Sequence, residues 1–184
     1  YDPEGAWRCR AKGIRTASLP EGPGPVVATR WDGAVADWVA RGGRLLLCVR
    51  GRGTGVPSVW RGFWREGVHL FHDHPLAARL SLLDRYWELA QGLATDTVLD
   101  LEAWRPAGAG TSPAVVSPIV SRVDCRRFDR HFWLGEVVVG QGRLLACSFR
   151  PDGGKGSAPP FFEENAAGQW LVAESLRYLR EGAG

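Results

Sequence analysis

The chain has 184 residues, of which 45% are hydrophobic, so it is long enough for one domain with a substantial core. Its formal net charge is +3, and the arginines are scattered among acidic residues, which argues against a nucleic-acid-binding surface. It contains no apolar run of about eighteen residues, so the sequence predicts no membrane-spanning segment.

The chain begins at Tyr1 and contains no methionine, so we expect a fragment or a processed product of a longer protein. The four cysteines show no CxxC spacing. Cys48 and Cys147 lie in apolar runs, where a thiol behaves as a small hydrophobic group. The composition leaves the cellular location undefined, with a cytoplasmic location favoured over secretion.

Residues 1–24 are rich in proline, glycine and charge, which is typical of a linker that becomes ordered only near Ile14–Leu19. Residues 25–181 are expected to form a single domain. It opens with a short strand at Val26–Ala28 and a helix at Asp32–Arg41, in which apolar residues recur at helical spacing.

Gly42 is expected to end that helix in a left-handed conformation. The next strand, Leu45–Val49, is apolar without alternation, which is typical of a strand covered on both faces. The strand–helix–strand order predicts a right-handed crossover unit. Glycines such as Gly51 follow the strand, and ligands in open α/β sheets bind at this carboxyl end. We therefore expect any inherited active site here.

Trp60 and Trp64 follow in a glycine-rich setting, four residues apart. On a helical turn both rings would lie on one face, where exposed aromatic rings stack on sugars or bases. Tryptophans beside an apolar segment also pack in cores, so both interpretations stay open.

A histidine-rich segment begins at His69 and ends at Pro75. His72 and His74 would point the same way on an extended segment, but they supply no third metal ligand. A helix start, with His74 or Asp73 as the cap and Pro75 in the first turn, is the simpler interpretation. The sequence therefore predicts no metal site, and His72 is kept as a candidate binding residue.

The second half of the chain alternates strand and loop patterns. The expected elements are a helix over Leu76–Leu93, strands at Val98–Leu101 and Ile119–Val123, long loops at Arg105–Pro118 and Arg150–Pro160, and a hairpin joining Glu136–Val139 to Leu144–Phe149. Within the last stretch, Phe161–Arg180, residues from Ala167 to Leu179 recur at the spacing of an amphipathic helix.

Cys48, near the end of the predicted strand Leu45–Val49, is a candidate nucleophile, but its surroundings do not suit a nucleophile elbow. An elbow has glycines two residues before and two after the nucleophile, whereas Cys48 has Leu46 and Arg50, and Gly51 comes one position too late. The His-x-Glu pair of the amidotransferase arrangement is also missing, because His131 is followed at that offset by Trp133. The position near Cys48, Arg50 and Gly51 therefore reads as a degenerate nucleophile site with no catalytic residues. No cofactor-binding motif is present.

Five segments in one order resemble a known family: Ala36–Leu47, His74–Ala77, Ser117–Asp124, Glu136–Ser148 and Leu176–Leu179. This series is similar to the amidotransferase-like accessory domain that follows the catalytic barrel in some bacterial family-2 glycoside hydrolases, the β-galactosidase and β-glucuronidase relatives. The long Gly/Pro loop before Ser117 and the cysteine at position 48 depart from that pattern.

The resemblance implies an α/β fold: a flavodoxin-like, class I glutamine-amidotransferase-like three-layer sandwich with a mixed, mainly parallel sheet and a C-terminal antiparallel hairpin. It also implies a noncatalytic accessory domain that serves domain packing, oligomerisation or carbohydrate-rim contacts. The expected partners are other domains of the parent hydrolase, with a homo-oligomer and carbohydrate left open. No cofactor, nucleic acid or membrane is expected.

Two alternatives from other classes remain. The chain would be a thiol-dependent, amidotransferase-like hydrolase if Cys48 were reactive. It would be a carbohydrate-binding module if Trp60, Trp64 and other exposed aromatic residues bound sugar.

Overall fold

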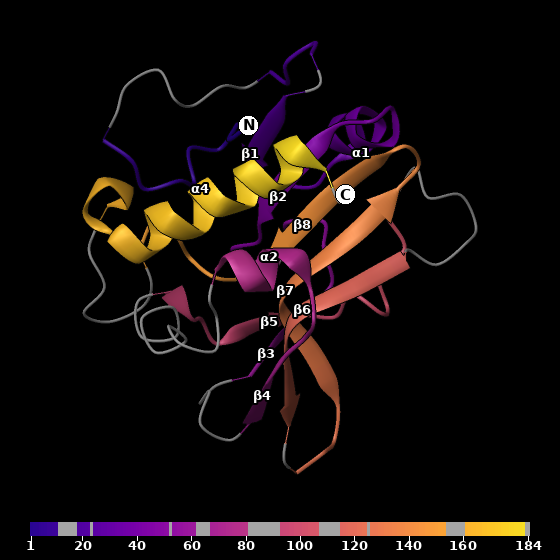
Figure 1. The fold of residues 1–184 in the computed structure, drawn as a ribbon, viewed down its shortest axis with the longest axis vertical. Coiled ribbons are helices and arrows are strands. Elements are labelled where there is room, and N and C mark those ends of the chain that lie inside the picture. Colours follow the sequence, from indigo (N-terminus) through magenta and orange to yellow (C-terminus); the bar gives the residue numbers. More distant parts are fainter. Residues whose placement is uncertain are drawn as a thin grey trace.

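The computed structural model describes residues 1–10, 18–22, 24–51, 53–61, 67–80, 93–106, 115–124, 126–153 and 161–182. In chain order the elements are β1 Pro25–Ala28, α1 Gly33–Ala40, β2 Arg44–Cys48, β3 Ser58–Trp60, β4 Gly67–Phe71, α2 Pro75–Arg79, β5 Thr97–Leu99, β6 Val115–Asp124, β7 Arg130–Val139, β8 Gly142–Cys147, the 3₁₀ helix η2 Phe162–Glu164 and α4 Ala166–Glu181. The strands form one curled sheet that resembles half of a barrel (Figure 1).

The sheet branches at β7. Along one edge, the second half of β7 pairs with β8, and the order continues through β2 to β1. Near its start the same edge pairs with β5, through Leu99 and Phe132, and β5 leads to β3. The other edge of β7 pairs with β6, which in turn pairs with β4.

The predicted fold class is wrong. Among the described strands only β1–β2 and β2–β8 are parallel pairs, and every other pair is antiparallel, so the sheet is not that of a flavodoxin-like sandwich. The physical reason is connectivity. Parallel neighbours need a crossover, whereas short turns join β6 to β7 and β7 to β8 and force antiparallel pairing.

The first crossover unit is confirmed. Asp32 caps α1 by accepting the Val35 N–H at 3.0 Å, and β1 and β2 pair in parallel. Gly42, at φ 107°, ends the helix: its N–H donates to Val39 O, and the next N–H, of Gly43, donates to Trp38 O. These two hydrogen bonds at the helix end form a Schellman motif, which needs the left-handed residue that the sequence indicated.

The hairpin prediction is also confirmed, with shifted bounds: β7 begins before Glu136, and β8 runs from Gly142 to Cys147 rather than from Leu144 to Phe149. The turn at Gly140 and Gln141 joins β7 to β8, with Gly140 at φ 59°. The Gln141 N–H donates to Ala40 O at 2.9 Å, and a Cβ on Gly142 would lie 1.8 Å from Val39 O. The turn therefore docks closely against the end of α1, and glycine at 142 permits that approach.

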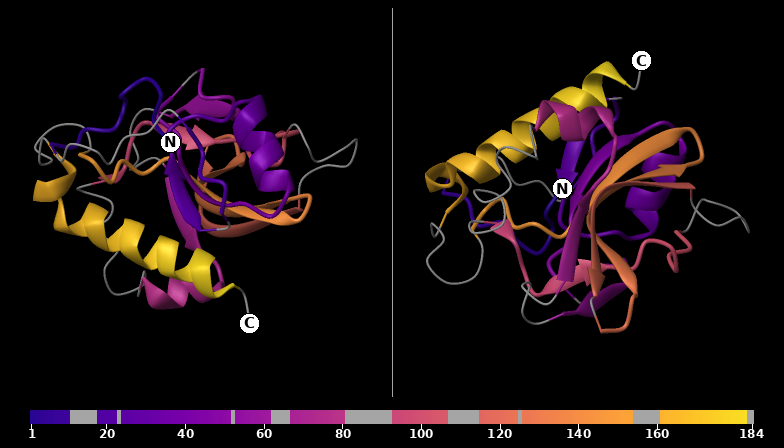
Figure 2. Two further views of the ribbon diagram at one scale, coloured as in Figure 1. Left: turned by 90° about the horizontal axis from the view of Figure 1, so that it is seen from above. Right: turned by 60° about the horizontal axis from the view of Figure 1, so that its bottom comes forward.

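Two hydrophobic layers lie on opposite faces of the sheet. α4 and α2 cover one face and α1 covers the other (Figure 2). Alternate side chains of β2 enter the two layers: Leu46 and Cys48 face α4, whereas Leu45 and Leu47 face α1. Val49, directly after the strand, also lies in the α1 layer. The expectation that both faces of this strand are covered is confirmed, and each fully buried leucine contributes roughly 2 kcal/mol by leaving water.

The predicted terminal helix is confirmed as α4, which contains every residue from Ala167 to Leu179. Asn165 caps α4 by accepting the Gly168 N–H at 3.0 Å, and η2 precedes it. Leu171, Ser175 and Tyr178 recur at helical spacing on its buried side. The helix therefore lies along the sheet with one face in the core.

Other predicted elements are partly described. The strand expected at Val98–Leu101 appears as β5, and Ile119–Val123 lies within β6. The loop predicted for Arg105–Pro118 is wrong at its end, because β6 already begins at Val115. The predicted helix Leu76–Leu93 begins as α2, and residues 81–92 lie outside the described residues.

The first ten residues lie against the body of the domain. Trp7 is buried in the layer under α4, and its ring lies 5.3 Å from that of Phe162. Asp2 is also buried, and it accepts the Thr29 hydroxyl at 2.8 Å. Most of the predicted ordering segment, Ile14–Leu19, falls outside the described residues.

Candidate functional site

The carboxyl ends of β2 and β8 meet in a small cleft. The two strands are parallel and in register through Cys48 and Cys147, so the chain leaves both at the same edge. The cleft has a volume of about 250 Å³ and is lined by Val49, Arg50, Trp60, Thr95, Asp96, Thr97 and Arg150. This is the edge at which the sequence placed a ligand site.

The Cys48 thiol does not enter the cleft. Its side chain is 2% exposed and packs in the layer under α4 beside Leu46 and Cys147. Burial raises the pKa of Cys48 well above its ordinary value, and it raises the pKa of Cys147 to about 12. Both thiols are therefore protonated at neutral pH.

The other residues of the predicted degenerate site follow Cys48. Gly51 turns the chain with φ 125°, and Arg50 lines the cleft. His131, considered as a base, lies on β7 opposite Arg122. Within the described part of the chain, no hydrogen bond joins Cys48 to a histidine.

Arg50 is held by a buried carboxylate. Its Nη2 donates to Oδ2 of Asp152, a fully buried residue, and the same oxygen accepts the Arg8 N–H at 2.7 Å. Burial of Arg50, together with the positive charge of Arg150, lowers the pKa of Arg50 to about 10. The guanidinium is thus fixed in position at the base of the cleft.

Arg150 is the less satisfied of the two cleft arginines. Its backbone N–H donates to Leu93 O, but its Nε is buried with no hydrogen-bond partner among the described residues. Burial and the nearby charge of Arg8 lower the pKa of Arg150. A partly desolvated cation beside another cation is an unfavourable arrangement unless an anion compensates it.

The predicted binding residues are only partly brought together. Trp60, on β3 opposite Thr97, is 65% exposed at the edge of the cleft. Trp64 lies outside the described residues. His72 does not line the cleft; its Nε2 lies 2.7 Å from the Ser121 hydroxyl, and burial, with the charge of Arg130, lowers its pKa.

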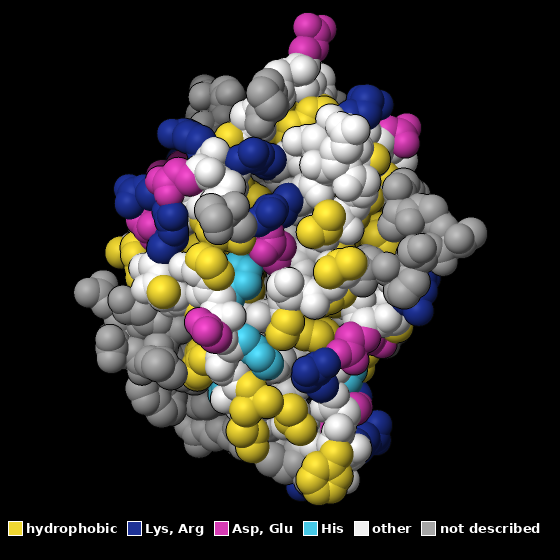
Figure 3. Space-filling model, turned by 45° about the vertical axis from the view of Figure 1, so that its right-hand side comes forward, with side chains coloured by type: hydrophobic (Ala, Val, Ile, Leu, Met, Phe, Trp, Pro, Cys, Tyr) yellow, Lys and Arg dark blue, Asp and Glu magenta, His cyan; other side chains and the backbone are white. Residues whose placement is uncertain are grey.

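The histidine-rich segment serves structure. His74 caps α2 by accepting the Leu76 N–H at 3.1 Å, as the helix-start interpretation predicted, and His69 stacks on Trp133 at 4.6 Å. In the view of Figure 3, histidine side chains reach the surface between hydrophobic side chains. Among the residues that the structure describes, no three His, Cys, Asp or Glu side chains form a metal-binding group.

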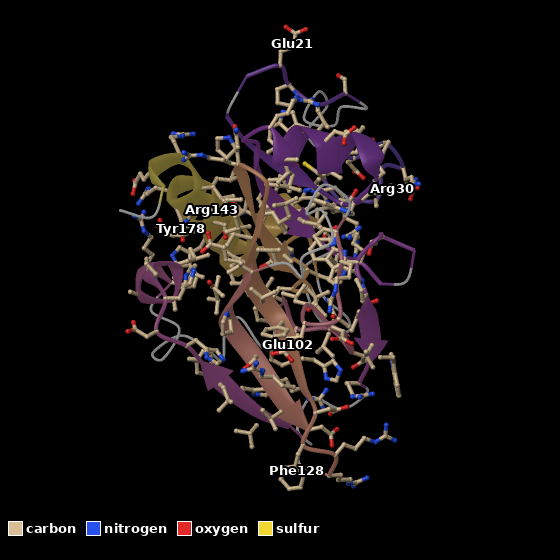
Figure 4. The ribbon with its side chains drawn as sticks, turned by 90° about the vertical axis from the view of Figure 1, so that its right-hand side faces the viewer. Glu21, Arg30, Glu102, Phe128, Arg143 and Tyr178 are labelled. Carbon is tan, nitrogen blue, oxygen red and sulfur yellow. The ribbon has the colours of Figure 1, made fainter. Side chains whose placement is uncertain are left out.

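A buried ionic network was not predicted from the sequence. Glu136 Oε2 accepts the Tyr178 hydroxyl at 2.9 Å and lies 2.9 Å from His74 Nε2. Arg143 Nη1 lies 2.8 Å from Glu136 Oε1 and 3.1 Å from the Tyr178 hydroxyl, beside which it is seen in Figure 4. The network ties α2 and α4 to the sheet, and a lone glutamate within a valine-rich strand was the only sequence signal for it.

A larger hollow lies elsewhere, between α1 and residues 18–22, with a volume of about 730 Å³. Its charged lining residues are Glu21, Asp37 and Arg41, and the Trp38 indole donates to Pro20 O at 3.0 Å. These groups form no arrangement suited to catalysis or to recognition of a particular ligand. We therefore place the candidate site at the strand ends.

Comparison with models of known protein families and with curated proteins found no match to this chain. No helix in the described ranges combines the length and the apolarity that crossing a membrane requires. The chemistry of the cleft is therefore the basis for assigning a function.

Proposed function

We propose that this chain is a noncatalytic accessory domain of a larger glycoside hydrolase, and that its cleft at the ends of β2 and β8 contacts a saccharide. The observation that carries the saccharide contact is the exposed ring of Trp60 beside the side chains of Thr95, Asp96 and Thr97. Sugars bind proteins by stacking apolar ring faces on aromatic side chains while polar groups bond their hydroxyls.

The alternative of a thiol hydrolase is disfavoured by the position of Cys48. A catalytic thiol must reach substrate and must ionise near neutral pH. Cys48 is buried beside Cys147, and burial raises its pKa. The cleft is lined by two arginines, two threonines, an aspartate, a tryptophan and a valine, a set that suits binding.

A packing role is supported by apolar side chains on the outer strands. Val68 and Leu70 alternate on β4 and are exposed, and Phe128, at the tip of the β6–β7 hairpin in Figure 4, is 81% exposed. Clustered exposed apolar groups mark contact surfaces in many proteins. The assignment to a glycoside hydrolase itself rests on the sequence resemblance.

The saccharide contact is tested by nuclear magnetic resonance of the tryptophan indole N–H groups. The Trp60 signal is assigned by its loss in Trp60→Phe, and neutral sugars such as galactose and lactose are titrated to millimolar concentration. We expect the Trp60 signal to shift and Trp60→Ala to lose binding. Phe128→Ala, at an exposed aromatic residue that does not line the cleft, should bind as the parent does.

A Trp60 signal that stays fixed with every sugar would overturn the saccharide contact. The parent enzyme is tested separately, from the coding sequence that adjoins this one. We expect it to encode a (β/α)₈ barrel with paired catalytic glutamates. A continuous reading frame without such a barrel would contradict the glycoside hydrolase assignment.

A further inference from the structure

A separate pocket lies between the N-terminal segment, β1 and α4, which run beside one another in Figure 1. It has a volume of about 210 Å³ and shares no lining residue with the cleft. Two of its walls are the rings of Trp7 and Phe162, whose centroids lie 5.3 Å apart and whose planes are tilted by 58°. The aliphatic side chains of Val27, Val172 and Leu176 add to this apolar lining.

Three polar side chains of the pocket already bond within the chain. Asp2 accepts the N–H groups of residues 6 and 7 and the Thr29 hydroxyl, and the Cys9 thiol donates to Glu163 Oε1 at 2.9 Å. A buried water makes about three hydrogen bonds to polar groups. Water in this pocket finds few such partners, so an apolar ligand gains affinity by displacing it.

We propose that this pocket binds a small, neutral aromatic group, which is a second binding function independent of the saccharide contact. An apolar cavity of roughly 150 Å³ accepts benzene, so a pocket of about 210 Å³ has room for a ring with a short substituent. The tilted rings of Trp7 and Phe162 favour an aromatic ligand, because a third ring can make edge-to-face or offset contacts with them. A neutral ligand is favoured because the Asp2 carboxylate repels an anion, and any ion loses its hydration in an apolar site.

The test titrates the protein with benzyl alcohol while the tryptophan indole N–H signals are followed by nuclear magnetic resonance. The Trp7 signal is assigned by its loss in Trp7→Phe. We expect it to shift in a saturable way with a dissociation constant of about 1 mM or lower, a modest affinity because the ligand is small. Cyclohexylmethanol, of similar size but without an aromatic ring, should bind several-fold more weakly. Benzoate, which has the ring and a negative charge, should bind at least tenfold more weakly.

Val172→Phe places a ring in the pocket and should abolish the binding of benzyl alcohol. Val68→Phe makes the same substitution at an exposed valine of β4 that does not line the pocket, so this matched control should bind as the parent does. Leu176→Ala enlarges the pocket and should admit 2-naphthylmethanol, which the parent should exclude. Thermal unfolding of each variant confirms that it is folded, and the enlarged variant provides a test that does not depend on Val172→Phe.

A Trp7 signal that stays fixed at millimolar benzyl alcohol would overturn the proposal. Cyclohexylmethanol binding as tightly as benzyl alcohol would overturn the aromatic assignment, and benzoate binding as tightly would overturn the neutral one. Unchanged binding in folded Val172→Phe would show that the ligand binds elsewhere. The Trp60 signal reports the cleft in the same spectra, so failure at this pocket and failure of the saccharide contact are distinguished.

Discussion

Cys48 of β2 and Cys147 of β8 are register partners on neighbouring parallel strands, and both thiols are free and buried. Neither is exposed to water, and burial raises the pKa of each. The pair occupies the end of the sheet where a hydrolase would present its nucleophile, but inside the core. The reactivity of Cys48 is therefore the sharpest measure of whether this domain has thiol chemistry.

The first prediction concerns alkylation by iodoacetamide at pH 8. A thiol with a pKa of about 12 is ionised to about one part in ten thousand at that pH, so Cys147 should react very slowly, and Cys48 likewise. The partly exposed Cys9 should react before Cys48 and Cys147. Peptide mass spectrometry over time measures each site, with a urea-unfolded sample as the control in which all sites react. Rapid, selective labelling of Cys48 in the folded protein would favour the thiol hydrolase.

Truncating Cys48 should destabilise the fold in a way that depends on the new side chain. Cys48→Ala removes one small buried group and should lower the free energy of unfolding by about 1 kcal/mol. Cys48→Ser should cost roughly 1–3 kcal/mol more, because its hydroxyl would be buried in an apolar layer. Urea unfolding of the parent and both variants gives these values. Serine as stable as alanine would mean that the hydroxyl finds a partner.

The Glu136 network should make stability depend on acid pH. Burial alone would raise the pKa of Glu136, but hydrogen bonds from His74 and Tyr178 and the charge of Arg143 lower it below the ordinary 4.5. A carboxyl with a lowered folded pKa stabilises the protein above its unfolded pKa, and that contribution is lost as pH falls through the folded pKa. The free energy of unfolding should therefore fall below about pH 4.5.

Glu136→Gln should reduce this pH dependence, because the amide does not titrate. The variant should be less stable than the parent near pH 7 and should lose less stability on acidification. Urea unfolding at intervals from pH 7 to pH 3 provides both profiles. Parallel profiles for the two proteins would show that other groups control the acid response.

Two helix glycines should respond oppositely to alanine. Alanine normally stabilises a helix by about 1 kcal/mol over glycine. A Cβ on Gly33 meets nothing within 4 Å, so Gly33→Ala should be neutral or stabilising. A Cβ on Gly168 would lie 1.9 Å from Pro151 O, so Gly168→Ala should destabilise despite its helix propensity. The midpoint temperatures of thermal unfolding of both variants test this prediction. A Gly168→Ala variant more stable than the parent would mean that the backbone at Pro151 moves away at little cost.

Local structure was predictable where the signal lay within a few residues. Asp32 and Gly42 bound α1 because capping depends on adjacent backbone groups, and the glycines at 140 and 142 specify the hairpin turn. The sheet order was not predictable in this way. A fully apolar strand such as β2 shows that both faces are covered, but it does not identify its neighbours.

Pro118 explains one specific error. The glycines and prolines up to Pro118 predicted a loop, so the predicted strand begins only at Ile119, and a proline lacks the N–H that a ladder needs. β6 instead runs through Pro118, opposite Gly135, with a register shift between Pro118 and Val120. The irregularity accommodates the missing donor, and a sequence pattern alone does not reveal a bulge.

The candidate site was predictable only in part. Arg50 and Trp60 were identified from their positions after a predicted strand and in a glycine-rich segment. Arg150 and Asp152 were not, because they come close to Arg50 only through the pairing of β8 with β2. The ion pair between Arg50 and Asp152 joins residues 102 positions apart. Contacts of that range leave no local signal.

The branching of the sheet at β7 has a consequence for how the molecule opens. β7 shares hydrogen bonds with β8 and β5 on one edge and with β6 on the other. Freeing β7 therefore breaks both branches at once, whereas β1, β3 and β4 each separate from a single described neighbour. Its amide protons should accordingly exchange with solvent only through global unfolding, which makes β7 the slowest-exchanging part of the chain.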